Sequence, residues 1–171
     1  VRLLVENAPM PYRAVLMTMF QAGLGEAEFE IFNKNALDIF HATTWDDVDK
    51  LLSRRGPVKV QMFRSKTSRT EMRKYYTFLS DDAKFLIRQW LKMRPQCDLP
   101  HLFVVRQKGR RKKAEYSPVT TPLIENRVTS LGKSLNLMSP RELGIKRYHV
   151  RPHRLRKVFM GECIRRGVPV W

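Results

Sequence analysis

The chain has 171 residues, and 43% of them are hydrophobic, so it can bury a core and its composition excludes wholesale disorder. Its 33 lysines and arginines against 16 acidic residues give a formal net charge of +17, and residues 101–171 alone carry seventeen basic and four acidic side chains. So high and uneven a charge predicts an anionic partner, with nucleic acid the first candidate and a membrane surface a possibility on charge alone.

The remaining totals bear on the cellular setting. The two cysteines, Cys97 and Cys163, show no ligand-like spacing, which favours a reduced intracellular protein. No stretch approaches the roughly 20 apolar residues of a membrane span, and no secretory signal opens the chain. We therefore expect a cytoplasmic, nucleoid-associated protein without a membrane partner. Val1 and Trp171 are interpreted as cuts through a longer protein.

The first part of the chain predicts helices. Apolar residues recur at helical spacing over residues 12–22, and Gly23 and Gly25 are expected to end that helix. Residues 26–35 favour a second short helix. Residues 43–56 favour a third, with a threonine cap candidate, acidic residues in the first turn and basic ones in the last.

The period of the apolar pattern then changes from helical spacing to alternation, which predicts a hairpin. Residues 57–63 alternate apolar and polar side chains, and the aromatic-rich residues 72–79 can pair back across a polar turn at 64–70. Residues 80–94 predict a helix with Ser80 as its cap. The apolar stripe expected on that helix consists of Phe85, Leu86, Trp90 and Leu91.

The basic C-terminal part predicts two more helices. Residues 106–118 favour a basic loop or loose hairpin, and residues 120–138 favour a helix with a proline near its first turn. The last helix is expected from Pro152 to Arg165, with Gly167 as its stop. No linker divides these elements. We expect one mainly helical α+β domain over residues 1–171, with one small antiparallel sheet.

The start of the last helix carries a candidate phosphate site. His153 and Arg156 are three residues apart, so a helix places them on one face, one turn apart. Free backbone N–H groups and the helix dipole favour an anion there, and an arginine can donate to two phosphate oxygens. An imidazole beside it can donate to a third oxygen or move a proton. A solvated basic face is the alternative that this spacing leaves open.

The surrounding string resembles a signature of tyrosine recombinases, the phage-integrase family. "PHRLRKVF" is similar to the second family box, P-H-x-L-R followed by a small apolar run, and "MGECIRRGVP" resembles the helix end that follows it. The lysine that follows the second-box arginine, Lys157, resembles the sequence of the archaeal branch of this family at that position.

A second box is similar except at one position. "FQAGLGEAEFEIF" resembles the first family box, T-G-L-R-x-x-E-L, with Gly23, Leu24, Glu28 and Phe29 aligned. Gly25 occupies the place of the arginine that, in the family, faces the second-box arginine and clamps the scissile phosphate.

The predicted hairpin carries the third likeness. "FRSKTSRTEMRKYYTFLSDDA" resembles the family's strand–turn–strand, in which a turn lysine acts as general acid, and Lys66 is its best match. An exposed turn lysine is the plainer interpretation of Lys66. In the family, a Gly-His box and the nucleophilic tyrosine follow the second box. All five tyrosines here precede it, so none is assigned as nucleophile.

The resemblance implies a tyrosine-recombinase-like catalytic domain, incomplete at its C-terminus and without the family's N-terminal core-binding domain. It implies double-stranded DNA as partner, self-assembly as a dimer or tetramer on DNA, and strand transfer through a 3′-phosphotyrosyl link without cofactor or metal. Lys66, His153 and Arg156 would be catalytic. The residues expected to contact the DNA backbone are Arg64, Arg69, Arg110, Arg111, Lys112, Lys113, Arg151, Arg154 and Lys157.

Two alternatives stay open, and a third is disfavoured. Because Gly25 replaces the arginine, an inactive DNA-binding remnant on the same fold is one of them, and the present chain is not expected to cleave DNA. A basic RNA-binding protein is another. A metal site of His149 and His153 with Cys163 is disfavoured, because Pro152 interrupts a helix common to both histidines. No Walker loop, zinc-finger spacing or Ser/His/Asp pattern is present.

Overall fold

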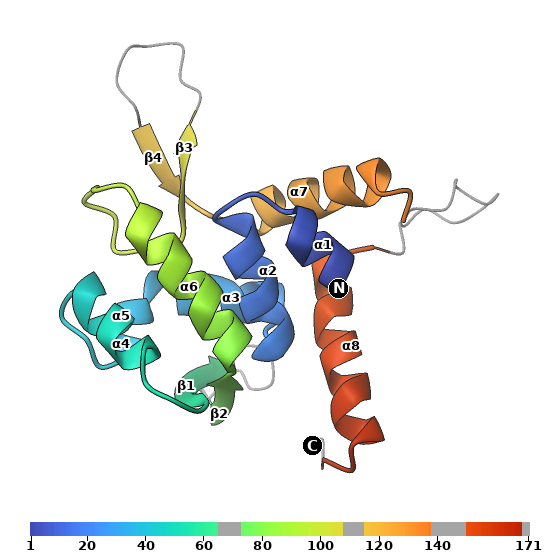
Figure 1. The fold of residues 1–171 in the computed structure, drawn as a ribbon, viewed down its shortest axis with the longest axis horizontal. Helices are drawn as coiled ribbons and strands as arrows, with labels where there is room; N and C mark the ends of the chain where they lie inside the picture. Colours follow the sequence, from blue (N-terminus) through green and yellow to red (C-terminus); the bar gives the residue numbers. More distant parts are fainter. Residues whose placement is uncertain (65–72, 108–114, 138–149, 169–171) are drawn as a thin grey trace.

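The computed structural model describes residues 1–64, 73–107, 115–137 and 150–168 (Figure 1). Of these residues, Phe63, Arg64, Arg73 and Glu115 are described by their backbone alone. The elements, in chain order, are α1 (Arg2–Asn7), α2 (Tyr12–Gln21), α3 (Glu26–Lys34), α4 (Ala36–Ile39), α5 (Trp45–Leu52), β1 (Val58–Arg64), β2 (Arg73–Leu79), α6 (Asp81–Met93), β3 (Val104–Gln107), β4 (Glu115–Pro118), α7 (Thr121–Ser134) and α8 (Pro152–Arg165).

The predicted α+β class is confirmed, but the described residues form two small sheets where one was expected. Strands β1 and β2 pair antiparallel from Val58 opposite Leu79, as the alternating pattern predicted. Strands β3 and β4 form a second antiparallel pair, which favours the loose-hairpin alternative over the loop for the ends of residues 106–118, while residues 108–114 lie outside the described residues. Val104 in β3 is fully buried, which anchors the strand that carries this basic segment.

Helix α2 lies at the centre of the molecule, between α6 on one side and α8 on the other (Figure 1). Its side chains Val15, Leu16 and Met19 are completely buried. Behind them, the rings of Phe29 in α3 and Phe103 before β3 stack with centroids 5.9 Å apart. The core therefore joins the helical N-terminal part to the start of the second sheet.

The stripe expected on α6 was right for Leu86, Trp90 and Leu91, which are buried or packed against the core, and wrong for Phe85. Phe85 is 59% exposed, and the buried line runs through Ala83, Ile87 and Trp90, with Lys84 beside it. The Lys84 ammonium donates to the carbonyls of Arg54 and Gly56 and to Asp81, at 2.5–2.7 Å. A lysine whose donors are satisfied in this way can face inward, which a purely apolar pattern does not reveal.

Ser80 is the N-cap residue of α6, as predicted, but its hydroxyl makes no capping bond to the helix. Gln21, at the end of α2, takes that role, because its Oε1 accepts from the Ala83 backbone N–H at 3.0 Å and from the Ser80 hydroxyl. Its Nε2 donates to Asp82 at 3.1 Å. The end of α2 thus fixes the start of α6.

Helices α1 and α4 were not predicted. They have six and four residues, which is too short for helical periodicity to stand out. Leu4 and Val5 of α1 are nevertheless buried against the rest of the fold. Among the described residues, no helix combines the length and apolar character needed to cross a bilayer.

Asn33 joins α3 to Phe103, directly before β3, and to Val119, directly after β4. Its Nδ2 donates to the carbonyls of Phe103 and Val119 at 3.2 Å each, and its Oδ1 accepts from the Phe103 N–H at 2.6 Å. The side chain is buried, so its removal leaves the Phe103 N–H and the Val119 carbonyl without this partner away from water, while the Phe103 carbonyl still accepts from the Val119 N–H at 3.0 Å.

Asn33→Ala is therefore expected to lower the free energy of unfolding by about 2–4 kcal/mol, measured by urea denaturation. Asn7→Ala is the matched control, because the Asn7 side chain bonds only an exposed helical carbonyl. The control is expected to stay within about 0.5 kcal/mol of the wild type. Equal losses in the two variants would contradict the role given to Asn33.

The predicted threonine cap of α5 is Thr44, which forms a reciprocal capping box with Asp47. Hydrogen bonds from the hydroxyls of Thr44 and Thr43 and from the Thr44 backbone lower the pKa of Asp47 from 3.8 to about 2. A lowered carboxyl pKa contributes stability that is present above pH 3.8 and lost as the pH falls towards 2.

Asp47→Ala is accordingly expected to lower the thermal unfolding midpoint at pH 6, with the gap to the wild type closing between pH 4 and pH 2. Asp46→Ala, in the same helical turn, is the control, because no capping bond of α5 involves Asp46. A gap independent of pH would show that the ionised carboxylate is not what stabilises this helix end.

Candidate functional site

Three separate segments meet at the connection between α2 and α3, residues 22–25. Strand β2 reaches it through Thr77, whose hydroxyl donates to the carbonyl of Ala22 at 2.8 Å. Helix α8 reaches it through Phe159 and Arg156. We call this junction the α2–α3/α8 site. It brings together the segments that carry all three sequence boxes.

Gly23 is required at this junction for two reasons. Its φ of +62° lies in the left-handed region that side chains with a Cβ rarely adopt. A Cβ at this position would also lie 2.7 Å from Cδ1 of Phe159. The glycine thus ends α2 and also lets the Phe159 ring of α8 pack directly on the backbone.

Arg156 is held by Glu28 in the first turn of α3. Its Nη1 donates to Glu28 Oε1 at 3.0 Å, across 128 residues of sequence. The Arg156 side chain is 23% exposed and that of Glu28 is 9% exposed. The pair is therefore largely withdrawn from solvent, where loss of either partner leaves the other charge poorly compensated.

Gly25 lies directly beside this ion pair. A Cβ at residue 25 would be 3.3 Å from Arg156 Nη1 and 2.5 Å from Glu28 Oε2. The backbone at φ −77° and ψ 176° is ordinary extended backbone, so it does not require a glycine. The place implied for the family's arginine is thus next to Arg156, and the Glu28 carboxylate fills the space of its missing side chain.

The other basic residues predicted on α8 lie at its N-terminal end, in the same part of the helix as Arg156. His153, Arg154 and Lys157 are exposed in the first turns of α8, and Arg151 is partly buried at its N-cap. Leu155 is buried and packs α8 onto the core. His153 therefore lies one turn from Arg156 in the predicted way, but Arg156 is turned inward to Glu28.

The remaining predicted residues are not part of the described site. Arg64 is the last residue of β1, and only its backbone is described. The others lie outside the described residues altogether: Lys66, Arg69, Arg110, Arg111, Lys112, Lys113 and His149. In the described ranges, no group of three or more His, Cys, Asp or Glu side chains could hold a metal ion.

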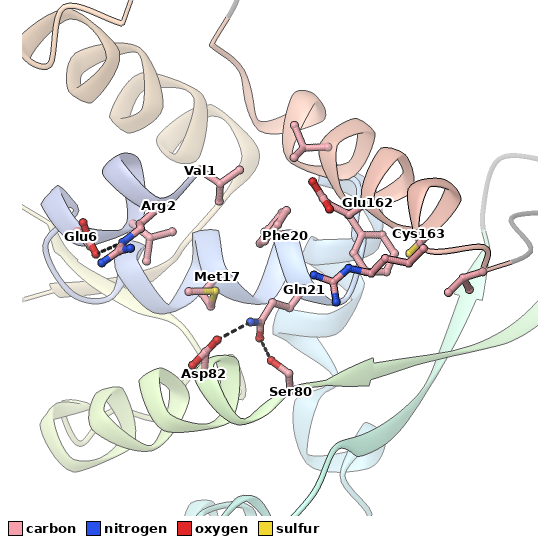
Figure 2. A pocket seen from close by; sticks show the side chains of 15 residues that line it. Val1, Arg2, Glu6, Met17, Phe20, Gln21, Ser80, Asp82, Glu162 and Cys163 are labelled. Carbon is pink, nitrogen blue, oxygen red and sulfur yellow. Dashed lines mark hydrogen bonds and ion pairs between the residues drawn. The ribbon is translucent and has the colours of Figure 1, made fainter.

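A cleft of about 990 Å³ separates the C-terminal half of α8 from α1, α2 and the start of α6. Figure 2 shows Met17 and Phe20 of α2 on one side and Glu162 and Cys163 of α8 on the other, with the Gln21–Ser80–Asp82 contacts at the edge. Farther along, Ile164 is 64% exposed. Helix α8 is thus held to the core by its first turns, at the α2–α3/α8 site.

Sequence reasoning missed two contacts that build the site. Thr77 is the only buried hydroxyl on the inner face of β2, and a polar residue at an inward position of the alternating pattern was the signal that could have found it. Phe159 gave no comparable signal, because nothing in its own segment indicates that it packs on a glycine far away in the sequence.

Comparison with protein-family models, curated proteins and solved structures finds no match to this chain. The likeness to tyrosine recombinases rests on the box residues of the sequence.

Gly23→Ala and Gly56→Ala together test the packing of α8 on this junction. Both glycines have positive φ, +62° and +82°, but nothing lies within 4 Å of a Cβ at Gly56. Gly56→Ala is expected to cost about 1–2 kcal/mol in unfolding free energy from backbone strain alone. Gly23→Ala is expected to cost at least about 1 kcal/mol more, because the methyl group also displaces Phe159. Equal costs in urea denaturation would contradict the close Phe159 contact.

Proposed function

We propose that this chain is the catalytic-domain part of a tyrosine-recombinase-type protein that binds the phosphodiester backbone of duplex DNA at the α2–α3/α8 site. The observation that carries the proposal is the 3.3 Å separation between Arg156 Nη1 and the Cβ position of residue 25. The family resemblance pairs these two positions on one phosphate, although they come from opposite ends of the chain.

The proposed chemistry is phosphoryl transfer. Arg156 would donate to the non-bridging oxygens of the scissile phosphate, since fixed donors that meet developing charge usually dominate such catalysis. His153, exposed one turn earlier, would share that phosphate and assist proton transfer. Lys66 would protonate the leaving 5′ oxygen. The attacking tyrosine would come from a part of the protein beyond the second box.

A second candidate function is favoured by the residues around Arg156. Glu28 already neutralises the arginine, and Gly25 supplies no second cation beside it. A site of this kind binds a phosphate less strongly than one with two arginines, because the phosphate must first displace the carboxylate. A DNA-binding protein on the same fold that does not cleave its substrate is therefore the alternative proposal.

Glu28→Gln is expected to strengthen duplex DNA binding about three- to tenfold at low salt, because Arg156 is then released for a phosphate. The slope of log affinity against log salt should steepen by about 1, the amount expected for one added contact. Fluorescence anisotropy over a range of salt concentrations measures both quantities.

Glu30→Gln is the matched control, because it removes the same charge from the same helix. Glu30 is exposed and accepts from Thr121 on α7. Its substitution is expected to change duplex affinity less than twofold. A similar gain from both variants would mean that net charge, and not release of Arg156, sets the affinity.

Covalent trapping on a nicked suicide duplex, with the full-length protein, distinguishes the two candidates. A protein–DNA adduct that Arg156→Lys weakens supports the recombinase. Duplex binding without any adduct supports the DNA-binding remnant. Tighter binding of double-stranded RNA than of duplex DNA at matched salt would contradict both.

A further inference from the structure

The outward face of the β1–β2 hairpin carries exposed aromatic and basic side chains. The inward face buries Val60, Met62 and Leu79 against the helices. On the opposite face, Tyr76 is 56% exposed and Phe78 is 52% exposed. Figure 1 shows this hairpin at the end of α6 away from β3 and β4, so the face is separate from the second sheet.

The two rings have a regular spacing on this face. Tyr76 and Phe78 are two residues apart in β2, so their side chains project on the same side about 7 Å apart. Across the hairpin, Lys59 pairs with Phe78 and Gln61 with Tyr76. The Lys59 ammonium lies 3.7 Å from the centroid of the Tyr76 ring. Lys74 is exposed on the same side of β2.

We propose that this face binds unpaired bases of a single-stranded nucleic acid, with Tyr76 and Phe78 as stacking platforms and Lys59 and Lys74 as phosphate contacts. An open sheet face with aromatic rings at this spacing accepts successive splayed bases, since every base has a π-face. The bases of an intact duplex are stacked on each other and are not available to such rings.

The charge of the hairpin favours nucleic acid over a protein partner. Neither β1 nor β2 contains an acidic residue, and the whole chain carries a net charge of +17. The contact between Lys59 and Tyr76 is exposed, so it is weak enough for a base to displace the ammonium towards a neighbouring phosphate. The inference is independent of cleavage chemistry and of the α2–α3/α8 site.

The test compares two labelled oligonucleotides of equal length and charge, oligothymidylate and its abasic counterpart, by fluorescence anisotropy. The wild type is expected to bind oligothymidylate about tenfold more tightly than the abasic strand, since only the former can stack. Tyr76→Ala and Phe78→Ala are each expected to remove most of that preference. Phe85→Ala is the matched control, because Phe85 is equally exposed but lies on α6.

Photo-crosslinking of the unaltered protein to bromouracil-containing strands, with mass mapping, gives a second measurement that needs no variant. Crosslinks are expected at Tyr76 or Phe78. Equal affinity for the abasic strand, or crosslinks only elsewhere, would overturn the proposal. So would a self-association in sedimentation that Phe78→Ala abolishes, because the face would then be an interface between copies. Duplex affinity in the Glu28→Gln variant is a separate readout, so the two proposals can fail independently.

Discussion

The ion pair between Arg156 and Glu28 is the contact on which the candidate site depends. It joins α8 to the first turn of α3 at 3.0 Å, in surroundings that leave the Glu28 side chain only 9% exposed. Phe159 packs on Gly23 one turn further along α8, so a charged and an apolar contact hold the same two segments. Together with buried Leu155, they position the basic first turns of α8 relative to residue 25.

This contact also limits the chemistry. A chain with a net charge of +17 has many cations with which to attract a nucleic acid, but few are positioned by buried partners. Arg156 is so positioned, and the partner that positions it is an anion that competes with phosphate. The proposed recombinase and the proposed DNA-binding remnant differ in whether a phosphate overcomes the competition of Glu28 for Arg156. The glycine at residue 25 favours Glu28 in this competition, since it adds no second cation.

The longer elements were predictable because their local patterns are strong. The bounds of α2, α6 and α8 lie within a residue or so of the expected ranges, and the β1–β2 pairing follows from simple alternation. The inward position of Lys84 on α6 was not predictable, since its ammonium is satisfied by carbonyls from a distant turn. Short helices such as α1 lack a period to detect.

The site was predictable only in part, for a different reason. Spacing on one helix placed His153 and Arg156 together. The family resemblance implied that residue 25 faces Arg156, and a Cβ at residue 25 would lie 3.3 Å from Arg156 Nη1. The pairing of Arg156 with Glu28 spans 128 residues, and neither local segment contains a signal for it. Long-range ion pairs are set by how helices pack, and helical patterns specify faces without specifying partners.

We propose that Arg156 exchanges Glu28 for a DNA phosphate. Nitrogen-15 NMR of the arginine Nε–H groups, assigned by the Arg156→Lys variant, follows that exchange during titration with duplex DNA. If this exchange occurs, the Arg156 signal moves in proportion to the fraction of protein bound to DNA. Glu28→Gln is expected to shift the same signal before DNA is added. An Arg156 signal that stays unchanged at saturating DNA, while the signals of Arg154 and Arg151 move, would contradict the account.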